Sequence, residues 1–211
     1  MSNKLVIMLH GVGSNGDDLL PIAQFWQKQC PHLDIASPDA PFSFMNSREA
    51  FQWFSIQGVT EQNRLQRIEQ ARESFDKTIG QIVRNAGYEQ RLEDVIFCGF
   101  SQGTMMALDA VVSGRWKIAG MIGFSGRLVT PVQGAITTPI LLMHGLNDTV
   151  ISAQESQLAL AQLQQVDANV QLKNYPNLDH AINEQEVQDG LAFIQSLSSI
   201  NYGTENKRLN K

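Results

Sequence analysis

The segment GFSQG at 99–103 places Ser101 between two glycines, each two positions away. An apolar run precedes this G-x-S-x-G pattern, and a helical segment begins at Gln102 directly after it. A strand that turns sharply into a helix needs small residues beside the serine, and it lifts the hydroxyl above the sheet as an exposed nucleophile. The similar segment 123–127 has Arg127 in place of the second glycine, so Ser125 is interpreted as a strand-end serine.

A serine hydroxyl needs an imidazole base, and the imidazole needs a carboxylate that holds its tautomer. In hydrolases with a strand-to-helix serine, the chain order is serine, then acid, then histidine. His180 follows the last strand-like run and precedes the last helical segment, where the base belongs. His144 comes before the candidate acid, so its order does not fit the base.

Two carboxylates are candidates for the acid. Asp148 lies just after the apolar run 139–145, although it could instead cap the next helix. Asp179 adjoins His180, and adjacent side chains rarely reach each other in the required geometry. We therefore predict a catalytic set of Ser101, Asp148 and His180.

The glycines of HGVGSNGDD at 10–18 match a second pattern. Gly11, Gly13 and Gly16 fit G-x-G-x-x-G after a strand, which is the dinucleotide fingerprint. Asp17 and Asp18 would oppose the charge of a pyrophosphate at that turn. A nucleotide-dependent oxidoreductase is therefore an alternative function, and a turn that offers a backbone N–H to an oxyanion is the stronger interpretation.

Short apolar runs alternate with segments of helical periodicity along the chain. This alternation predicts an α/β fold with a mostly parallel sheet and helices on both faces. We expect one domain over residues 1–200 and a polar, flexible tail over 201–211. The predicted strands are 5–9, 33–40, 95–100, 117–124, 139–145 and 169–175, and the predicted helices are 19–30, 64–86, 102–113, 153–166 and 184–199.

The longest connection, from Pro38 to about Asn63, is rich in aromatic residues. Loops of this length are often functional, so its large side chains are candidates for an acyl-binding pocket. Anchoring of the loop on the core is an equally good interpretation of the same residues. No basic residue marks a site for a phosphate or choline headgroup. The candidate substrate-binding residues are Phe42, Phe44, Met45, Trp53 and Phe54.

The composition of the chain limits the kinds of binding partner that we expect. The chain of 211 residues carries a net charge of −5, which gives it no electrostatic attraction to nucleic acids or anionic membranes. No apolar segment has the length of a membrane span, so stable membrane insertion is not expected. Cys30 and Cys98 do not make a disulfide framework, and we expect a cytoplasmic protein.

Five segments in a fixed order resemble the phospholipase/carboxylesterase family of α/β hydrolases, which includes the acyl-protein thioesterases. Residues 47–64 look especially like a bacterial esterase branch of that family. The segments are LHGVGSNGDD (9–18), QWFSIQG (52–58), GFSQGTMMAL (99–108), HGLNDTVI (144–151) and DHAI (179–182).

The resemblance implies Ser101 as nucleophile, Asp148 as orienting acid and His180 as base, with the backbone N–H groups of Val12 and Gln102 as the oxyanion hole. It also implies a compact α/β-hydrolase fold that lacks a large cap domain and has missing or reduced N-terminal strands. Hydrolysis of a small acyl ester or thioester would need no metal and no cofactor. A homodimer is compatible with the resemblance.

Two departures from the family pattern stand near the expected site. Ser55 follows Trp53-Phe54 where many members have aspartate, and Asp179 precedes the histidine where many have glycine. The first departure weakens any close analogy of substrate. A non-catalytic ligand binder of the same fold is a further alternative, because a fold does not fix a function.

Overall fold

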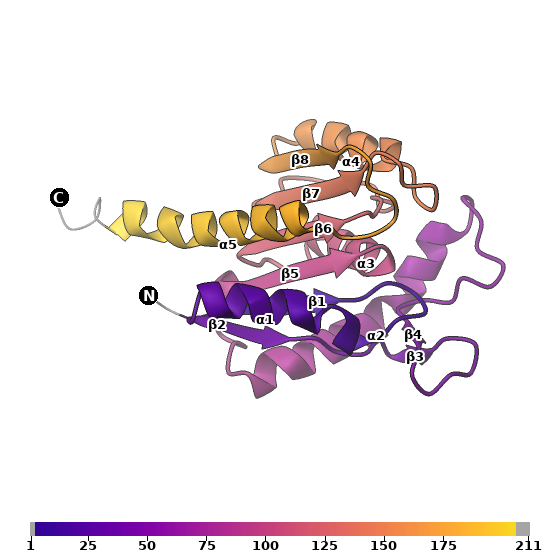
Figure 1. Cartoon of the computed structure of the whole chain (residues 1–211), viewed down its shortest axis with the longest axis horizontal. Coiled ribbons are helices and arrows are strands. Elements are labelled where there is room, and N and C mark those ends of the chain that lie inside the picture. Colours follow the sequence, from indigo (N-terminus) through magenta and orange to yellow (C-terminus); the bar gives the residue numbers. More distant parts are fainter. Residues whose placement is uncertain (1–2, 206–211) are drawn as a thin grey trace.

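The apolar runs form the strands of one parallel sheet (Figure 1). The computed structural model describes the backbone of residues 3–205 and the side chains of residues 3–197. Within that range the strands follow the order β2-β1-β5-β6-β7-β8, and every neighbouring pair is parallel. Their bounds are β1 Lys4–Leu9, β2 Leu33–Ala36, β5 Val95–Phe100, β6 Gly120–Phe124, β7 Ile140–Gly145 and β8 Val170–Tyr175.

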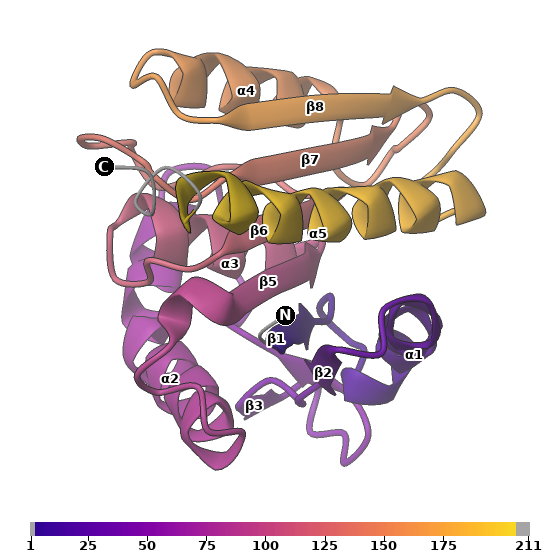
Figure 2. The same cartoon turned by 90° about the vertical axis from the view of Figure 1, so that its left-hand side faces the viewer.

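Helices cover both faces of the sheet, with α1 and α5 on one side and α2, α3 and α4 on the other (Figures 1 and 2). Alternate residues of β1 serve the two layers: Leu5 and Ile7 pack with α2 and α3, whereas Val6 and Met8 pack with α1 and α5. The helix bounds are α1 Leu20–Gln29, α2 Arg64–Asn85, α3 Gln102–Val112, α4 Gln154–Gln164 and α5 Glu184–Glu205, with short 3₁₀ turns at Gly16–Asp18 and Leu92–Asp94.

The helices begin and end close to the predicted positions. Pro21 stands in the first turn of α1, where its missing N–H costs nothing. The weak strand predicted over 33–40 ends at Ala36, ahead of Pro38. Helix α5 continues to Glu205, and the rest of the predicted tail, 206–211, lies outside the described residues.

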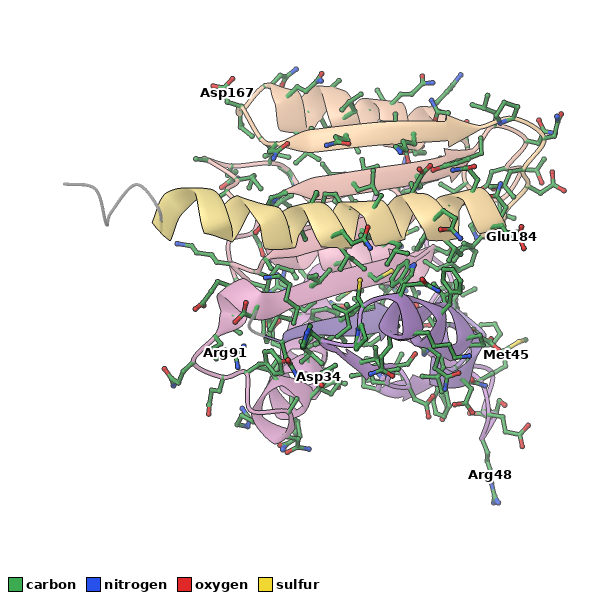
Figure 3. All side chains as sticks on the ribbon, turned by 60° about the vertical axis from the view of Figure 1, so that its left-hand side comes forward. Asp34, Met45, Arg48, Arg91, Asp167 and Glu184 are labelled. Carbon is green, nitrogen blue, oxygen red and sulfur yellow. The ribbon has the colours of Figure 1, made fainter. Side chains whose placement is uncertain are left out.

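The long connection between β2 and α2 folds back on itself as a small hairpin. Its strands are β3 Phe42–Ser43 and β4 Phe51–Gln52, and Phe51 also pairs with Ser14 of the first turn. Met45 and Arg48 lie at the outer end of the hairpin and point away from the molecule (Figure 3). The hairpin therefore rests beside the turn that follows β1.

Parallel strands bring the turns after β1, β5, β7 and β8 to one edge of the sheet. Glu184, at the start of α5, marks this carboxyl edge, and Asp167 lies at the opposite edge (Figure 3). Ligands of parallel α/β sheets bind at the carboxyl edge. Within the described residues, no helix is both long enough and apolar enough to cross a membrane.

Candidate active site

Ser101 occupies the junction between β5 and α3 in a backbone conformation that residues with side chains rarely adopt, with φ at 53° and ψ at −113°. A Cβ on Gly103 would lie 1.9 Å from the carbonyl oxygen of Leu9, and one on Gly99 would lie 2.5 Å from the nitrogen of Thr104. Both approaches are impossible for a larger residue. The predicted sharp turn is therefore present, and close packing explains its glycines.

The structure brings the three predicted catalytic side chains together from three turns. Nε2 of His180 lies 3.0 Å from Oγ of Ser101, and Nδ1 of His180 lies 2.7 Å from Oδ2 of Asp148. Ser101 and Asp148 are buried, while the side chain of His180 keeps 17% of its surface exposed. Asp179, the other candidate acid, is exposed.

Asp148 uses its two oxygens for two purposes. Oδ1 accepts hydrogen bonds from the backbone N–H groups of Val150 and Ile151, each at 2.9 Å, and Oδ2 accepts one from His180. Burial alone would raise the pKa of Asp148, but the hydrogen bonds from His180, Ile151 and Val150 together hold it below the usual value. Asp148 is therefore a charged acceptor that both fixes its own turn and orients the imidazole.

His144 is a second histidine beside Asp148. It is fully buried at the end of β7, and its Nε2–H donates to the carbonyl of Ile151 at 2.8 Å while lying 3.2 Å from Oδ2 of Asp148. Its Nδ1 then accepts from the hydroxyl of Ser156 at 2.6 Å. From the sequence, His144 is excluded as the base and has no other predicted role. His144 lies at the end of the strand that leads into the Asp148 turn, and this position was the signal that the sequence offered.

In the turn after β1, close packing and hydrogen bonds within the protein account for the glycines. A Cβ on Gly16 would lie 2.0 Å from the carbonyl oxygen of Ser37, and the Gly16 N–H donates to Oδ1 of Asp39 at 2.9 Å. The Gly13 N–H donates to the carbonyl of Phe51 at 2.8 Å. Two of the amides that a pyrophosphate would need are therefore engaged within the protein. The dinucleotide interpretation is not favoured.

Gln102 anchors the aromatic connection to the serine turn. Its Oε1 accepts from the backbone N–H of Trp53 at 2.7 Å, and its Nε2 donates to the carbonyl of Phe54 at 2.8 Å. The indole N–H of Trp53 donates to the carbonyl of His10 at 2.9 Å. The sequence predicts a role only for the backbone N–H of Gln102, and the structure shows that its buried side chain also joins the serine turn to the aromatic connection.

Two hollows meet at Ser101. The larger, of about 510 Å³, is lined by Val12, Phe100 and His180 among others, and the smaller, of about 170 Å³, also contains Val12 together with Gln102. Both residues predicted for the oxyanion hole therefore border the serine.

The five large side chains of the connection fall into different places. Phe54 lines the smaller hollow, and Trp53 is buried in the core. Phe42 and Met45 are exposed, and the ring of Phe44 packs against Gly13. Four of the five thus lie outside the linings of both hollows.

Arg64 and Arg127 also line the smaller hollow. From the sequence, no basic residue marked a site for a phosphate or choline headgroup, and the presence of these two arginines in the lining is a finding of the structure. Arg64 is the first residue of α2, and Arg127 follows the turn after β6, so they are distant in sequence. No local pattern connects them.

The fold and the chain order of its turns are those of an α/β hydrolase, as the sequence predicted. A model of the phospholipase/carboxylesterase family matches residues 1–198, and the chain belongs to that family. It is therefore a hydrolase of the carboxylesterase class, which confirms the class of enzyme that the sequence predicted.

The similar proteins agree with this assignment. Esterase YpfH of Escherichia coli K12 is 29% identical over 195 residues, which cover 92% of this chain and 83% of that protein. Carboxylesterase SOBER1 of Arabidopsis thaliana is 26% identical over 215 residues, covering 93% of this chain and 90% of its own. The crystal structure of esterase PE8 superposes with a TM-score of 0.84 at 29% identity, covering 93% of each chain.

Proposed function

We propose that this protein is a serine esterase that hydrolyses small acyl esters and thioesters through an acyl-enzyme on Ser101. The observation that carries the proposal is the continuous contact from Ser101 Oγ through His180 to Asp148, at 3.0 and 2.7 Å. The names of similar proteins, which include esterases and an acyl-protein thioesterase, support the substrate class.

In the first half-reaction, Nε2 of His180 takes the Ser101 proton as Oγ attacks the acyl carbonyl. The backbone N–H groups of Val12 and Gln102 stabilise the negative oxygen of the tetrahedral intermediate, and each such donor typically contributes about 10²–10³ in rate. His180 then gives the proton to the leaving alcohol or thiol. Asp148 stabilises the imidazolium and keeps Nδ1 protonated throughout.

In the second half-reaction, His180 takes a proton from water, and the resulting hydroxide attacks the acyl-enzyme carbonyl. The ester bond to Ser101 breaks, His180 returns the proton to Oγ, and the carboxylic acid leaves.

Replacement of Ser101 tests the proposal. Ser101→Ala should lower kcat/KM for p-nitrophenyl butyrate by about 10⁴ or more. Ser125→Ala is the matched control, because Ser125 lies in the similar segment after β6 and should leave the rate unchanged. A Ser101→Ala protein that kept most of the activity would refute the assignment.

A fluorophosphonate probe separates the enzyme from a non-catalytic binder of the same fold. The wild-type protein should be labelled covalently at Ser101, and Ser101→Ala should not. A folded wild-type protein that resists labelling would favour the binder.

We further propose that residues 1–200 behave as one folding unit, that the protein works in the cytoplasm without nucleic acid, and that it forms a homodimer. The cytoplasmic location is supported by the two cysteines, Cys30 and Cys98, which are both free. Sedimentation equilibrium of the purified protein tests the dimer, and a single cooperative unfolding transition tests the single unit.

A further inference from the structure

The two hollows at Ser101 have different relations to His180. The larger is lined by His180, whereas the smaller lies on the side of Gln102 and Met105 and does not include the imidazole. On the proposed function, on which this inference rests, the leaving group takes its proton from His180 and must depart through the larger hollow. The acyl group then occupies the smaller one.

The smaller hollow combines an apolar lining with two arginines. Phe54, Ile56 and Met105 supply apolar wall, and Arg64 and Arg127 complete it. The arginine side chains are only 16% and 14% exposed. Arginines are rarely buried unless they are paired, and the few polar groups in an apolar pocket usually orient its ligand.

Each of these guanidinium groups has an unused donor. The Nε atoms of Arg64 and Arg127 are buried and have no hydrogen-bond partner among the described residues. A buried N–H without an acceptor is costly, and such groups usually have a partner. The two Nε atoms have no exposed surface, so a carboxylate in the hollow would meet the Nη groups that now hold Glu61.

Glu61 shows which acceptor the two arginines suit. Nη2 of Arg64 lies 2.7 Å from Oε1 of Glu61, and Nη1 of Arg127 lies 2.9 and 3.0 Å from its two oxygens. The two guanidinium groups thus converge on one carboxylate. The side chain of Glu61 is 67% exposed, and exposed ion pairs contribute little stability, so this carboxylate can yield its place.

Glu155 supplies a second, weaker negative charge near the pair. Its Oε1 lies 3.6 Å from Nη2 of Arg127, and its side chain is 30% exposed. Glu61 and Glu155 together balance the charge of the two arginines while the pocket is empty. A substrate carboxylate that displaces Glu61 keeps the same balance.

We propose that the smaller hollow binds acyl groups that end in a carboxylate, so that the preferred substrates are half-esters of short dicarboxylic acids. The apolar wall contacts the methylene chain, and Arg64 and Arg127 bind the terminal carboxylate by charge-assisted hydrogen bonds. The volume of about 170 Å³ equals that of about six water molecules, which suits an acyl group of succinyl or glutaryl length.

The test compares monobenzyl glutarate with benzyl pentanoate, which has the same number of acyl carbons and no terminal charge. Wild-type protein should hydrolyse the glutarate half-ester with the higher kcat/KM. Arg127→Met and Arg64→Met should each lower the ratio of the two kcat/KM values about tenfold or more, because a charge-assisted hydrogen bond is lost. A wild-type preference for the pentanoate, or a ratio that neither variant changes, would overturn the proposal.

Two further variants control for charge. Arg67→Met removes a cation of the same helix that lies outside both linings and donates to the carbonyl of Gln57, so the ratio should not change. Glu61→Gln removes the competing carboxylate and should raise the ratio. An equal fall of the ratio in Arg67→Met and Arg127→Met would show a general field effect and refute the specific site.

Inhibition gives a measurement that needs no variant. Free glutarate should inhibit the wild-type hydrolysis of benzyl pentanoate more strongly than pentanoate does at the same ionic strength, and equal inhibition contradicts the proposal. The Ser101→Ala result separates a failure of the carboxylate site from a failure of the proposed esterase activity. If Ser101→Ala abolishes hydrolysis and wild type still prefers the pentanoate, the carboxylate site fails while the proposed esterase stands.

Discussion

His144 and Asp148 face each other inside the protein, with Nε2 of His144 3.2 Å from Oδ2 of Asp148. This is the same oxygen that Nδ1 of His180 contacts at 2.7 Å. Asp148 is therefore held from its own turn by two backbone amides and from the last loop by His180, while His144 of β7 donates to the carbonyl of Ile151 in that turn. The acid of the proposed triad is positioned by residues on both sides.

His144 should act as a positioning residue for Asp148. His144→Leu is expected to lower kcat about tenfold with little change in KM, because the hydrogen bond from Nε2–H to the carbonyl of Ile151, whose N–H holds Oδ1 of Asp148, is lost away from the substrate. His144→Gln should recover part of the loss, since its amide can donate toward the carbonyl of Ile151. Steady-state kinetics on p-nitrophenyl butyrate measure both values.

The exposed His32 supplies the control for this experiment. His32→Leu should leave kcat unchanged. If His144→Leu raised KM and left kcat intact, His144 would support the fold of the pocket and would not position the acid.

The side chain of Gln102 should stabilise the connection between β2 and α2. Gln102→Ala removes two buried hydrogen bonds but keeps the backbone N–H, so we expect the free energy of unfolding to fall by about 2–3 kcal/mol. The activity should also fall, because Phe54 lines the smaller hollow and loses its anchor. Urea denaturation measures the stability.

The exposed Gln70 on α2 is a matched position. Gln70→Ala should change the free energy of unfolding by less than about 0.5 kcal/mol. Equal stabilities of Gln102→Ala and wild type would mean that the side-chain hydrogen bonds of Gln102 contribute nothing to the free energy of unfolding.

Glu186 should make stability depend on pH. The side chain is fully buried at the start of α5, where Glu186 and Asn183 exchange hydrogen bonds as a capping box. Burial raises the pKa of Glu186 to about 7, although the backbone N–H of Asn183 partly opposes the rise. The folded protein therefore binds this proton more tightly than the unfolded chain does.

The sign follows from proton linkage. Between the unfolded pKa of 4.5 and the folded pKa of about 7, the folded state holds more protons, so the Glu186 contribution to stability is lost as the pH rises. Glu186→Gln keeps an acceptor for Asn183 and removes the titration. We expect the variant to be more stable than wild type by up to about 3 kcal/mol at pH 8 and nearly equal to it at pH 4.5.

Thermal unfolding at the two pH values measures this difference. Glu184→Gln, two residues earlier at an exposed position, is the matched control and should change the free energy of unfolding by less than about 0.5 kcal/mol. A Glu186→Gln protein whose stability relative to wild type is the same at both pH values would rule out the buried, titrating carboxyl.

The sequence by itself determined the order of strands and helices, the sharp turn at Ser101 and the turns in which Asp148 and His180 stand. These features depend on short stretches of sequence. Apolar runs predict buried strands, and the glycines around Ser101 permit the sharp turn. The alternation of strands and helices predicts a parallel sheet, which brings the turns to one edge. A residue with a Cβ does not fit at position 103 beside the backbone of Leu9, which explains why the glycines of this short pattern predict the turn.

The tertiary structure alone decided what surrounds the serine. Arg64 and Arg127 come from the start of α2 and the turn after β6, and only the packing of these elements brings both guanidinium groups to one small hollow. The side chain of Gln102 likewise meets a connection about 50 residues earlier in the chain. These residues belong to different elements that are far apart in the sequence. No periodic pattern along the chain therefore predicts that they meet.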